Sequence, residues 1–218
     1  MINYDMILFD LDGTLTDPKI GITKSVQYAL AKLNIQEDNL DKLEAFIGPP
    51  LVESFQEFYE LTSAAAQQAL IYYRDYFVQI GMYENFVYPG IPQLLQELTK
   101  HNKKLIVATS KPTVFSETIL KYFQLAHYFP LVIGSNLDGT RVAKTEIIAC
   151  ILEEVADDSG KVNVVMVGDR QYDIIGAKNN NIDSIAVSYG YGSLAELTAA
   201  EPDYIVHSVP GLRRILLG

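Results

Sequence analysis

The stretch MILFDLDGT, residues 6–14, decides how the rest of the chain is interpreted. Its first four residues are apolar without alternation, which is typical of a parallel strand covered on both faces. Two carboxylates, Asp10 and Asp12, follow where this strand ends, and Gly13 comes next. In an open α/β sheet, chemistry gathers at the carboxyl ends of the strands. The stretch therefore predicts a buried strand with a functional site at its end.

Five further apolar runs favour strands of the same sheet, at residues 105–108, 131–133, 162–167, 184–187 and 204–206. Helical patterns separate them, most clearly over 92–102 and 144–156. Strands that alternate with helices are typical of βαβ units. The sequence thus predicts an α/β protein built on a doubly wound parallel sheet.

Residues 17–88 break this alternation. They show no strand pattern, only helix-like segments over 22–33, 51–60 and 63–80, with Ser63 expected as the N-cap of the last. The stretch contains 12 of the 23 aromatic residues, too many for a linker. We therefore predict an all-helical domain, 17–88, inserted into a core of residues 1–16 and 89–218.

The composition excludes several classes of protein. The chain has 218 residues and a formal net charge of −10, which argues against a nucleic-acid polymer as partner and against a polybasic membrane anchor. A single cysteine, Cys150, indicates no internal disulfide. No apolar run approaches the roughly 20 residues of a membrane span, and no secretory signal is evident. We expect a cytoplasmic protein without a membrane partner; nothing in the sequence indicates an oligomeric state.

The neighbouring carboxylates of Asp10 and Asp12 repel each other unless a cation or a shared proton joins them. Mg²⁺ is the hard, oxygen-preferring ion that suits them. Asp-Gly is also a common turn pair, and the string Leu-Asp-Gly-Thr recurs at residues 137–140 with no apolar strand directly before it. We predict a loop there, so the short string alone does not identify a site.

Polar residues follow other strands as well. Asp169 and Asp173 come after the run 162–167 and share a face if a helix begins after the preceding glycine, although acidic residues also complement a helix dipole. Thr109 and Ser110 end the run 105–108 and would either cap the next helix or bind an anion. Lys144 opens a predicted helix and by itself is an ordinary solvated lysine.

Taken together, these residues resemble the haloacid dehalogenase superfamily of phosphatases. Its four motifs appear in order, as residues 10–14, then Thr109, then Lys144, then Asp169 with Asp173. The resemblance spans almost the whole chain. It implies a Rossmann-like core, with residues 17–88 as the helical cap. Within the superfamily the chain is similar to the phosphoglycolate phosphatase group and, through residues 134–144, to a branch described as 5′-nucleotidases.

The resemblance implies a Mg²⁺-dependent phosphomonoester hydrolase that acts through a phosphoaspartate on a small phosphorylated metabolite. Asp10 would be the nucleophile, and Asp12 would protonate the leaving oxygen and later activate water. Mg²⁺ would be held by Asp10, Asp169, Asp173 and the backbone carbonyl of Asp12. The residues expected to bind the phosphoryl group are Gly13, Thr109, Ser110 and Lys144, of which Thr109 and Lys144 are also counted as catalytic.

The substrate is less constrained than the reaction. Phosphoglycolate or a 5′-nucleotide is expected, with Gly48 and Pro49 of a cap loop and Arg141 as specificity residues. A phosphomutase would share all four motifs, and a non-enzymatic phospho-acceptor module would also phosphorylate an aspartate at a strand end. The acid at Asp12 favours phosphate chemistry over dehalogenation, because no phosphoryl leaving group needs a proton in a dehalogenase.

Overall fold

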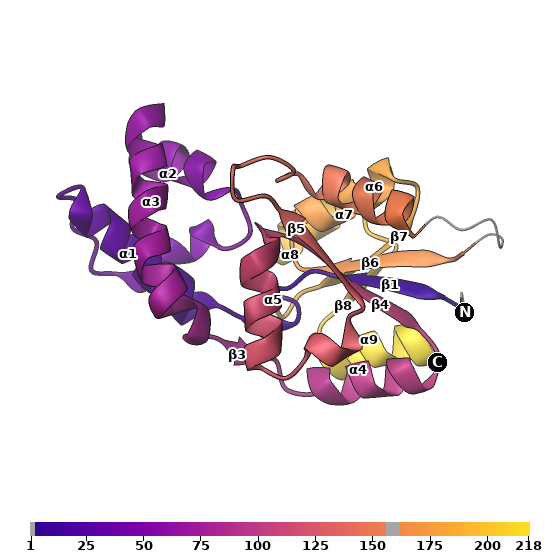
Figure 1. Cartoon of the computed structure of the whole chain (residues 1–218). Helices are drawn as coiled ribbons and strands as arrows, with labels where there is room; N and C mark the ends of the chain where they lie inside the picture. The colour runs from indigo at the N-terminus through magenta and orange to yellow at the C-terminus, as the bar shows by residue number, and fades with distance from the viewer. Residues whose placement is uncertain (1–2, 156–161) are drawn as a thin grey trace. The chain divides into compact units, whose positions relative to one another are not determined.

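The computed structural model describes residues 3–155 and 162–218 (Figure 1). The chain divides into two compact units, one of Met1–Thr16 with Val87–Gly218 and one of Asp17–Phe86. The second unit therefore ends two residues before the boundary placed at residue 88. Short strands β2 (Thr16–Asp17) and β3 (Phe86–Val87) pair with each other where the chain passes from one unit to the other, although the sequence indicated no strand there.

The larger unit is built on a six-stranded sheet in the order β5-β4-β1-β6-β7-β8, and all its neighbouring strands are parallel. The strands are β5 (Leu131–Ser135), β4 (Lys104–Pro112), β1 (Met6–Phe9), β6 (Val164–Gly168), β7 (Asp183–Val187) and β8 (Tyr204–Val206). Phe9 pairs with Val107 on one side and with Val167 on the other. The carboxyl ends of β4, β1 and β6 consequently meet at one edge, as the predicted doubly wound sheet requires.

Helices connect these strands and supply the core. They are α4 (Ile91–Lys100), α5 (Thr113–Tyr122), α6 (Lys144–Glu154), α7 (Gln171–Asn179), α8 (Leu194–Ala199) and α9 (Val209–Leu217), with a 3₁₀ turn η3 (Ala126–Tyr128). Helix α6 packs beside α7, and α4 beside α9 (Figure 1). Met6 and Leu8 of β1 face Ile147 and Ile151 of α6 in one apolar cluster. This burial on both faces explains the continuous apolar runs.

Two details differ from the expectations, and a third cannot be compared. Strand β4 continues to Pro112, so Thr109 and Ser110 lie in the strand and do not cap α5. Helix α7 begins at Gln171, so Asp169 precedes it and only Asp173 is helical. The end expected for α6, at residue 156, lies outside the described residues.

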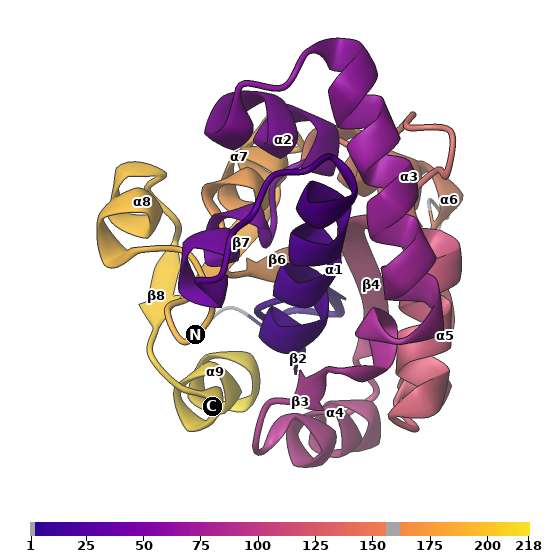
Figure 2. The ribbon, with the colours of Figure 1, turned by 90° about the vertical axis from the view of Figure 1, so that its left-hand side faces the viewer.

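The smaller unit is helical. It contains α1 (Lys19–Lys32), η1 (Leu40–Phe46), α2 (Leu51–Tyr59), α3 (Ser63–Gln79) and η2 (Gly81–Tyr83). Helices α1 and α2 both pack on α3 (Figure 2). The N-cap of α3 is Thr62, whose Oγ1 accepts from the amide of Ala65, and not Ser63. Aromatic pairs such as Phe46–Phe55 and Tyr73–Phe77 fill the interior. None of the helices in the described part of the chain is long and apolar enough to cross a membrane.

Candidate active site

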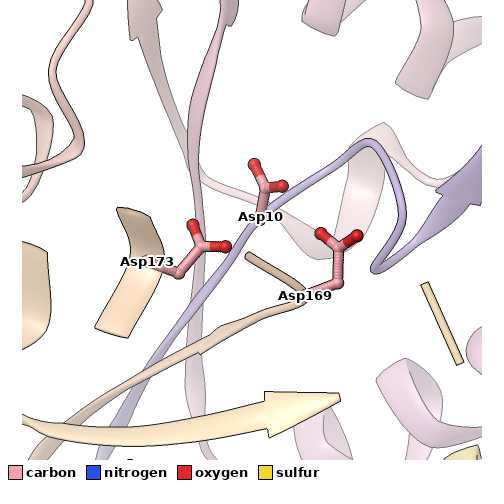
Figure 3. A group of neighbouring side chains, drawn as sticks. All are labelled: Asp10, Asp169 and Asp173. Carbon is pink, nitrogen blue, oxygen red and sulfur yellow. The ribbon is translucent and has the colours of Figure 1, made fainter. Parts of the chain in front are cut away.

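Three carboxylates converge at the carboxyl edge of the sheet. Asp10 follows β1, Asp169 follows the adjacent β6, and Asp173 lies in the first turn of α7 (Figure 3). Each offers an oxygen within 4.8 Å of the others, and all three residues are buried. The parallel pairing of β1 with β6 brings the two strand ends together, and the turn into α7 adds the third group. The structure thus brings together three of the residues that the resemblance implied as metal ligands, and their binding of a metal stays a prediction.

Lys144 neutralises part of this charge. Its Nζ donates to Asp10 Oδ1 at 2.8 Å and to the carbonyl of Ala108 at 2.8 Å, and it lies 2.7 Å from Asp173 Oδ1. Burial opposes the ammonium form, but the two neighbouring carboxylates outweigh it and raise the pKa of Lys144. A Cβ on Gly176 would lie 2.9 Å from Lys144 Cγ, so a glycine on α7 makes room for the side chain. Lys144 is therefore not a solvated lysine.

The cluster still holds more negative charge than one ammonium can offset. Burial, together with the charges of Asp10 and Asp173, raises the pKa of Asp169. The hydrogen bond from the amide of Tyr191 lowers this pKa by a smaller amount. Burial also raises the pKa of Asp173, against the attraction of Lys144. The three carboxylates are buried together, and Lys144 pairs with two of them, Asp10 and Asp173. Such a set fits a divalent, oxygen-preferring cation.

Glycines determine how closely Asp169 is enclosed. A Cβ on Gly13 would lie 2.1 Å from Asp169 Oδ2, and a Cβ on Gly190 would lie 2.4 Å from the same atom. The amide of Tyr191 donates to this oxygen at 2.7 Å. The residues that follow β7 were missed from the sequence, although the string Tyr-Gly-Tyr-Gly after a strand, residues 189–192, is a signal for close backbone approach.

Asp12 stands apart from the three clustered carboxylates. Its Oδ2 lies 2.7 Å from the Nζ of Lys111, and both side chains are nearly buried. Burial raises the pKa of Asp12, and the ammonium of Lys111 opposes that shift. The sequence reasoning missed Lys111, whose only signal was its place two residues after Thr109 on the same strand. The expected metal contact of the Asp12 carbonyl stays a prediction.

The residues expected to bind a phosphoryl group lie at the same edge. Gly13 has a φ of +86°, and Thr109 is buried, with its Oγ1 accepting from the amide of Lys111 at 3.3 Å. Ser110 follows Thr109 in β4, and its carbonyl accepts from Ser135 Oγ. Their contact with phosphate stays a prediction.

Arg141, one of the expected specificity residues, makes its hydrogen bonds within the loop that precedes α6. The guanidinium of Arg141 donates to the carbonyl of Gly134 and to Asn136 Oδ1, and approaches Cys150 Sγ at 3.7 Å. These contacts hold the loop that precedes α6. Gly48 and Pro49 belong to the helical unit, and their role toward a substrate stays a prediction.

A carboxylate at a strand end, a buried ammonium and a group of oxygen donors at one sheet edge form a site that can stabilise a phosphoryl group in transfer. The family model of the haloacid dehalogenase-like hydrolases matches residues 7–187. The chain belongs to this family, and it is a phosphatase of the family, as the resemblance implied.

Individual relatives have different names. A "5′-nucleotidase" from Pseudomonas aeruginosa is 45% identical over 99% of this chain and 96% of its own length. A "Tyrosine-protein kinase PtkA" from Mycobacterium tuberculosis is 31% identical over 93% of this chain and 68% of its own. A "Phosphoglycolate phosphatase" from Vibrio vulnificus is 28% identical over 97% and 96%. The crystal structure of a predicted phosphatase from Clostridium acetobutylicum is 50% identical over 99% of both chains, with a TM-score of 0.94.

Proposed function

We propose that the chain is a Mg²⁺-dependent phosphomonoesterase that hydrolyses a 5′-nucleotide, or another small phosphorylated metabolite such as phosphoglycolate, through a phosphoaspartate on Asp10. The observation that carries this proposal is the position of the Asp10 carboxylate. It ends a central strand, accepts from Lys144 at 2.8 Å and lies beside Asp169 and Asp173. A carboxylate so placed can act as a nucleophile toward an anionic phosphorus centre.

The metal would be held by Asp10, Asp169 and Asp173. When bound, Mg²⁺ supplies positive charge that offsets the carboxylates and the phosphoryl oxygens. The chain itself supplies a positive charge at Lys144. The ammonium is held in place because it donates to Asp10 and to the carbonyl of Ala108.

The chain's residues account for both chemical steps. In the first, an Asp10 oxygen bonds to phosphorus, the bond from phosphorus to the leaving oxygen breaks, and Asp12 transfers its proton to that oxygen. In the second, a water oxygen bonds to phosphorus, the bond to Asp10 breaks, and Asp12 takes the proton of the water. Thr109 and Ser110 at the end of β4, with the backbone at Gly13, would donate to the phosphoryl oxygens.

The relatives rank the candidate substrates. The 45% identity to a protein named 5′-nucleotidase favours a nucleoside monophosphate over phosphoglycolate, whose named phosphatase is 28% identical. Transfer to an acceptor other than water, as in a phosphomutase, is the second candidate, because one relative is named a kinase. Hydrolysis releases inorganic phosphate and forms no new phosphorylated product, whereas transfer forms a phosphorylated acceptor. The cytoplasmic location stays a prediction.

The test is phosphate release from nucleoside monophosphates, phosphoglycolate and sugar phosphates, ranked by kcat/KM. We expect Asp10→Asn to fold and to lose turnover on every substrate. The matched control is Asp138→Asn, in the exposed second copy of Leu-Asp-Gly-Thr, which should keep full activity. Retained hydrolysis in Asp10→Asn would refute the nucleophile.

A further inference from the structure

Lys111 is a nearly buried charge that the proposed metal site and nucleophile leave unexplained. Its side chain is 7% exposed, and its Nζ lies 2.7 Å from Asp12 Oδ2. The Asp12 side chain is 11% exposed. Lysines are almost never this buried unless they are paired, so the contact with Asp12 is a built part of the site.

An irregularity in β4 carries Lys111 to this position. Strand β4 pairs with β5 at Ala108↔Ile133 and next at Pro112↔Ser135, so its register shifts across the residues between. Bulged strands re-aim side chains, and they are common beside active sites. The Lys111 amide donates to Thr109 Oγ1, and a Cβ on Gly134 would lie 2.1 Å from the Lys111 carbonyl oxygen. The backbone of Lys111 is therefore closely held by its neighbours.

The two oxygens of Asp12 have unequal surroundings. Oδ2 faces the ammonium of Lys111, whereas Oδ1 is buried and has no hydrogen-bond partner among the described residues. An ammonium has only donors, so a proton on Asp12 belongs on the oxygen that does not face it. The free oxygen is thus the one available for proton transfer.

We propose that Lys111 is a positioning residue that holds Asp12 by Oδ2 and thereby presents Oδ1 to the leaving oxygen of the substrate. The inference rests on the proposed function. In the first step the proton on Oδ1 moves to the leaving oxygen as the phosphorus–oxygen bond breaks, and Asp12 becomes a carboxylate. The positive charge of Lys111 beside Oδ2 offsets that new charge.

The test compares two esters that differ in their need for a proton. Phenyl phosphate has a basic leaving group, and 2,4-dinitrophenyl phosphate has one that departs as a stable anion. In Lys111→Met we expect kcat/KM to fall about 100-fold for phenyl phosphate and to stay within about threefold for the dinitrophenyl ester. Lys111→Arg, which keeps the charge, should show a smaller loss of the same selective kind. Lys121→Met, at a site where the side chain is 71% exposed, should match the wild type.

A double-mutant cycle tests whether Lys111 acts through Asp12. Asp12→Asn should show the same selective loss, and adding Lys111→Met to it should cost little more with phenyl phosphate. Equal losses on both esters, fully additive losses, or no loss in Lys111→Met would overturn the inference; equal losses would make Lys111 a substrate-binding group.

Failure of the proposed function looks different. In that case the wild type releases no phosphate from either ester, or Asp12→Asn shows no dependence on the leaving group. Circular dichroism and the urea midpoint identify a variant that does not fold. If Lys111→Met does not fold, Lys111→Arg provides the test. A ratio of kcat/KM for the two esters that is unchanged from the wild type in Lys111→Arg contradicts the positioning role.

Discussion

The glycines of the two Leu-Asp-Gly-Thr strings provide a controlled test of how the site is built. Gly13 and Gly139 have nearly the same φ, +86° and +87°. Alanine at either position meets the left-handed backbone cost of about 1–2 kcal/mol. Only at Gly13 would the new Cβ meet an obstacle, because nothing lies within 4 Å of a Cβ at Gly139.

The size of the additional cost follows from the contact with Asp169. A Cβ on Gly13 would lie 2.1 Å from Asp169 Oδ2, roughly 1.2 Å inside an ordinary carbon–oxygen contact of about 3.3 Å. Asp169 is fully buried, and Gly190 closes its other side. Relief requires losing the hydrogen bond from Tyr191 to a charged group, worth about 1.5–3 kcal/mol. We therefore expect Gly13→Ala to cost about 2.5–5 kcal/mol and Gly139→Ala about 1–2 kcal/mol.

Urea unfolding of the two variants and the wild type, without divalent metal, measures this difference. Phosphate release should be lost in Gly13→Ala, because Asp169 is displaced, and kept in Gly139→Ala. Equal shifts of the urea midpoint in the two variants, or full activity in Gly13→Ala, would refute the claim that Gly13 is required for the close approach of Asp169.

Three further predictions concern charge at the site. Lys144→Met leaves two buried carboxylates unpaired and should cost about 3–5 kcal/mol in urea unfolding, whereas Lys178→Met, at the exposed pair with Glu201, should cost no more than about 1 kcal/mol; similar shifts in both would contradict the buried pairing. Excess chelator should abolish phosphate release, and Mg²⁺ should restore it. Because the pKa values of Asp169 and Asp173 are raised in the fold, the metal-free protein loses stability as pH rises above the ordinary carboxyl pKa of about 4. Mg²⁺ should thus raise the melting temperature more at pH 7.5 than at pH 5, and an equal rise at both would count against these carboxylates as ligands.

Much of the site was predictable because strand ends are visible in a sequence. Asp10 and Asp169 each follow a continuous apolar run, and parallel pairing brings such ends to one edge of the sheet. The helical pattern over residues 144–156 placed Lys144 at the start of a helix, which the structure confirms.

The partners of these residues were not predictable in the same way. Nothing near Asp12 in the chain indicates Lys111, because their contact depends on the pairing of β1 with β4 and on the register shift in β4. The enclosure of Asp169 by Gly13 and Gly190 joins residues far apart in the chain.

The sequence by itself determined which groups stand at the strand ends, since apolar periodicity and chain order are local properties. Only the tertiary structure decided which charge faces which. Lys144, which by itself resembles a solvated lysine, is the buried partner of Asp10 and Asp173, and Asp12 pairs with Lys111. The physical reason is that ion pairing depends on distance and burial, which are fixed when separate strands and helices pack.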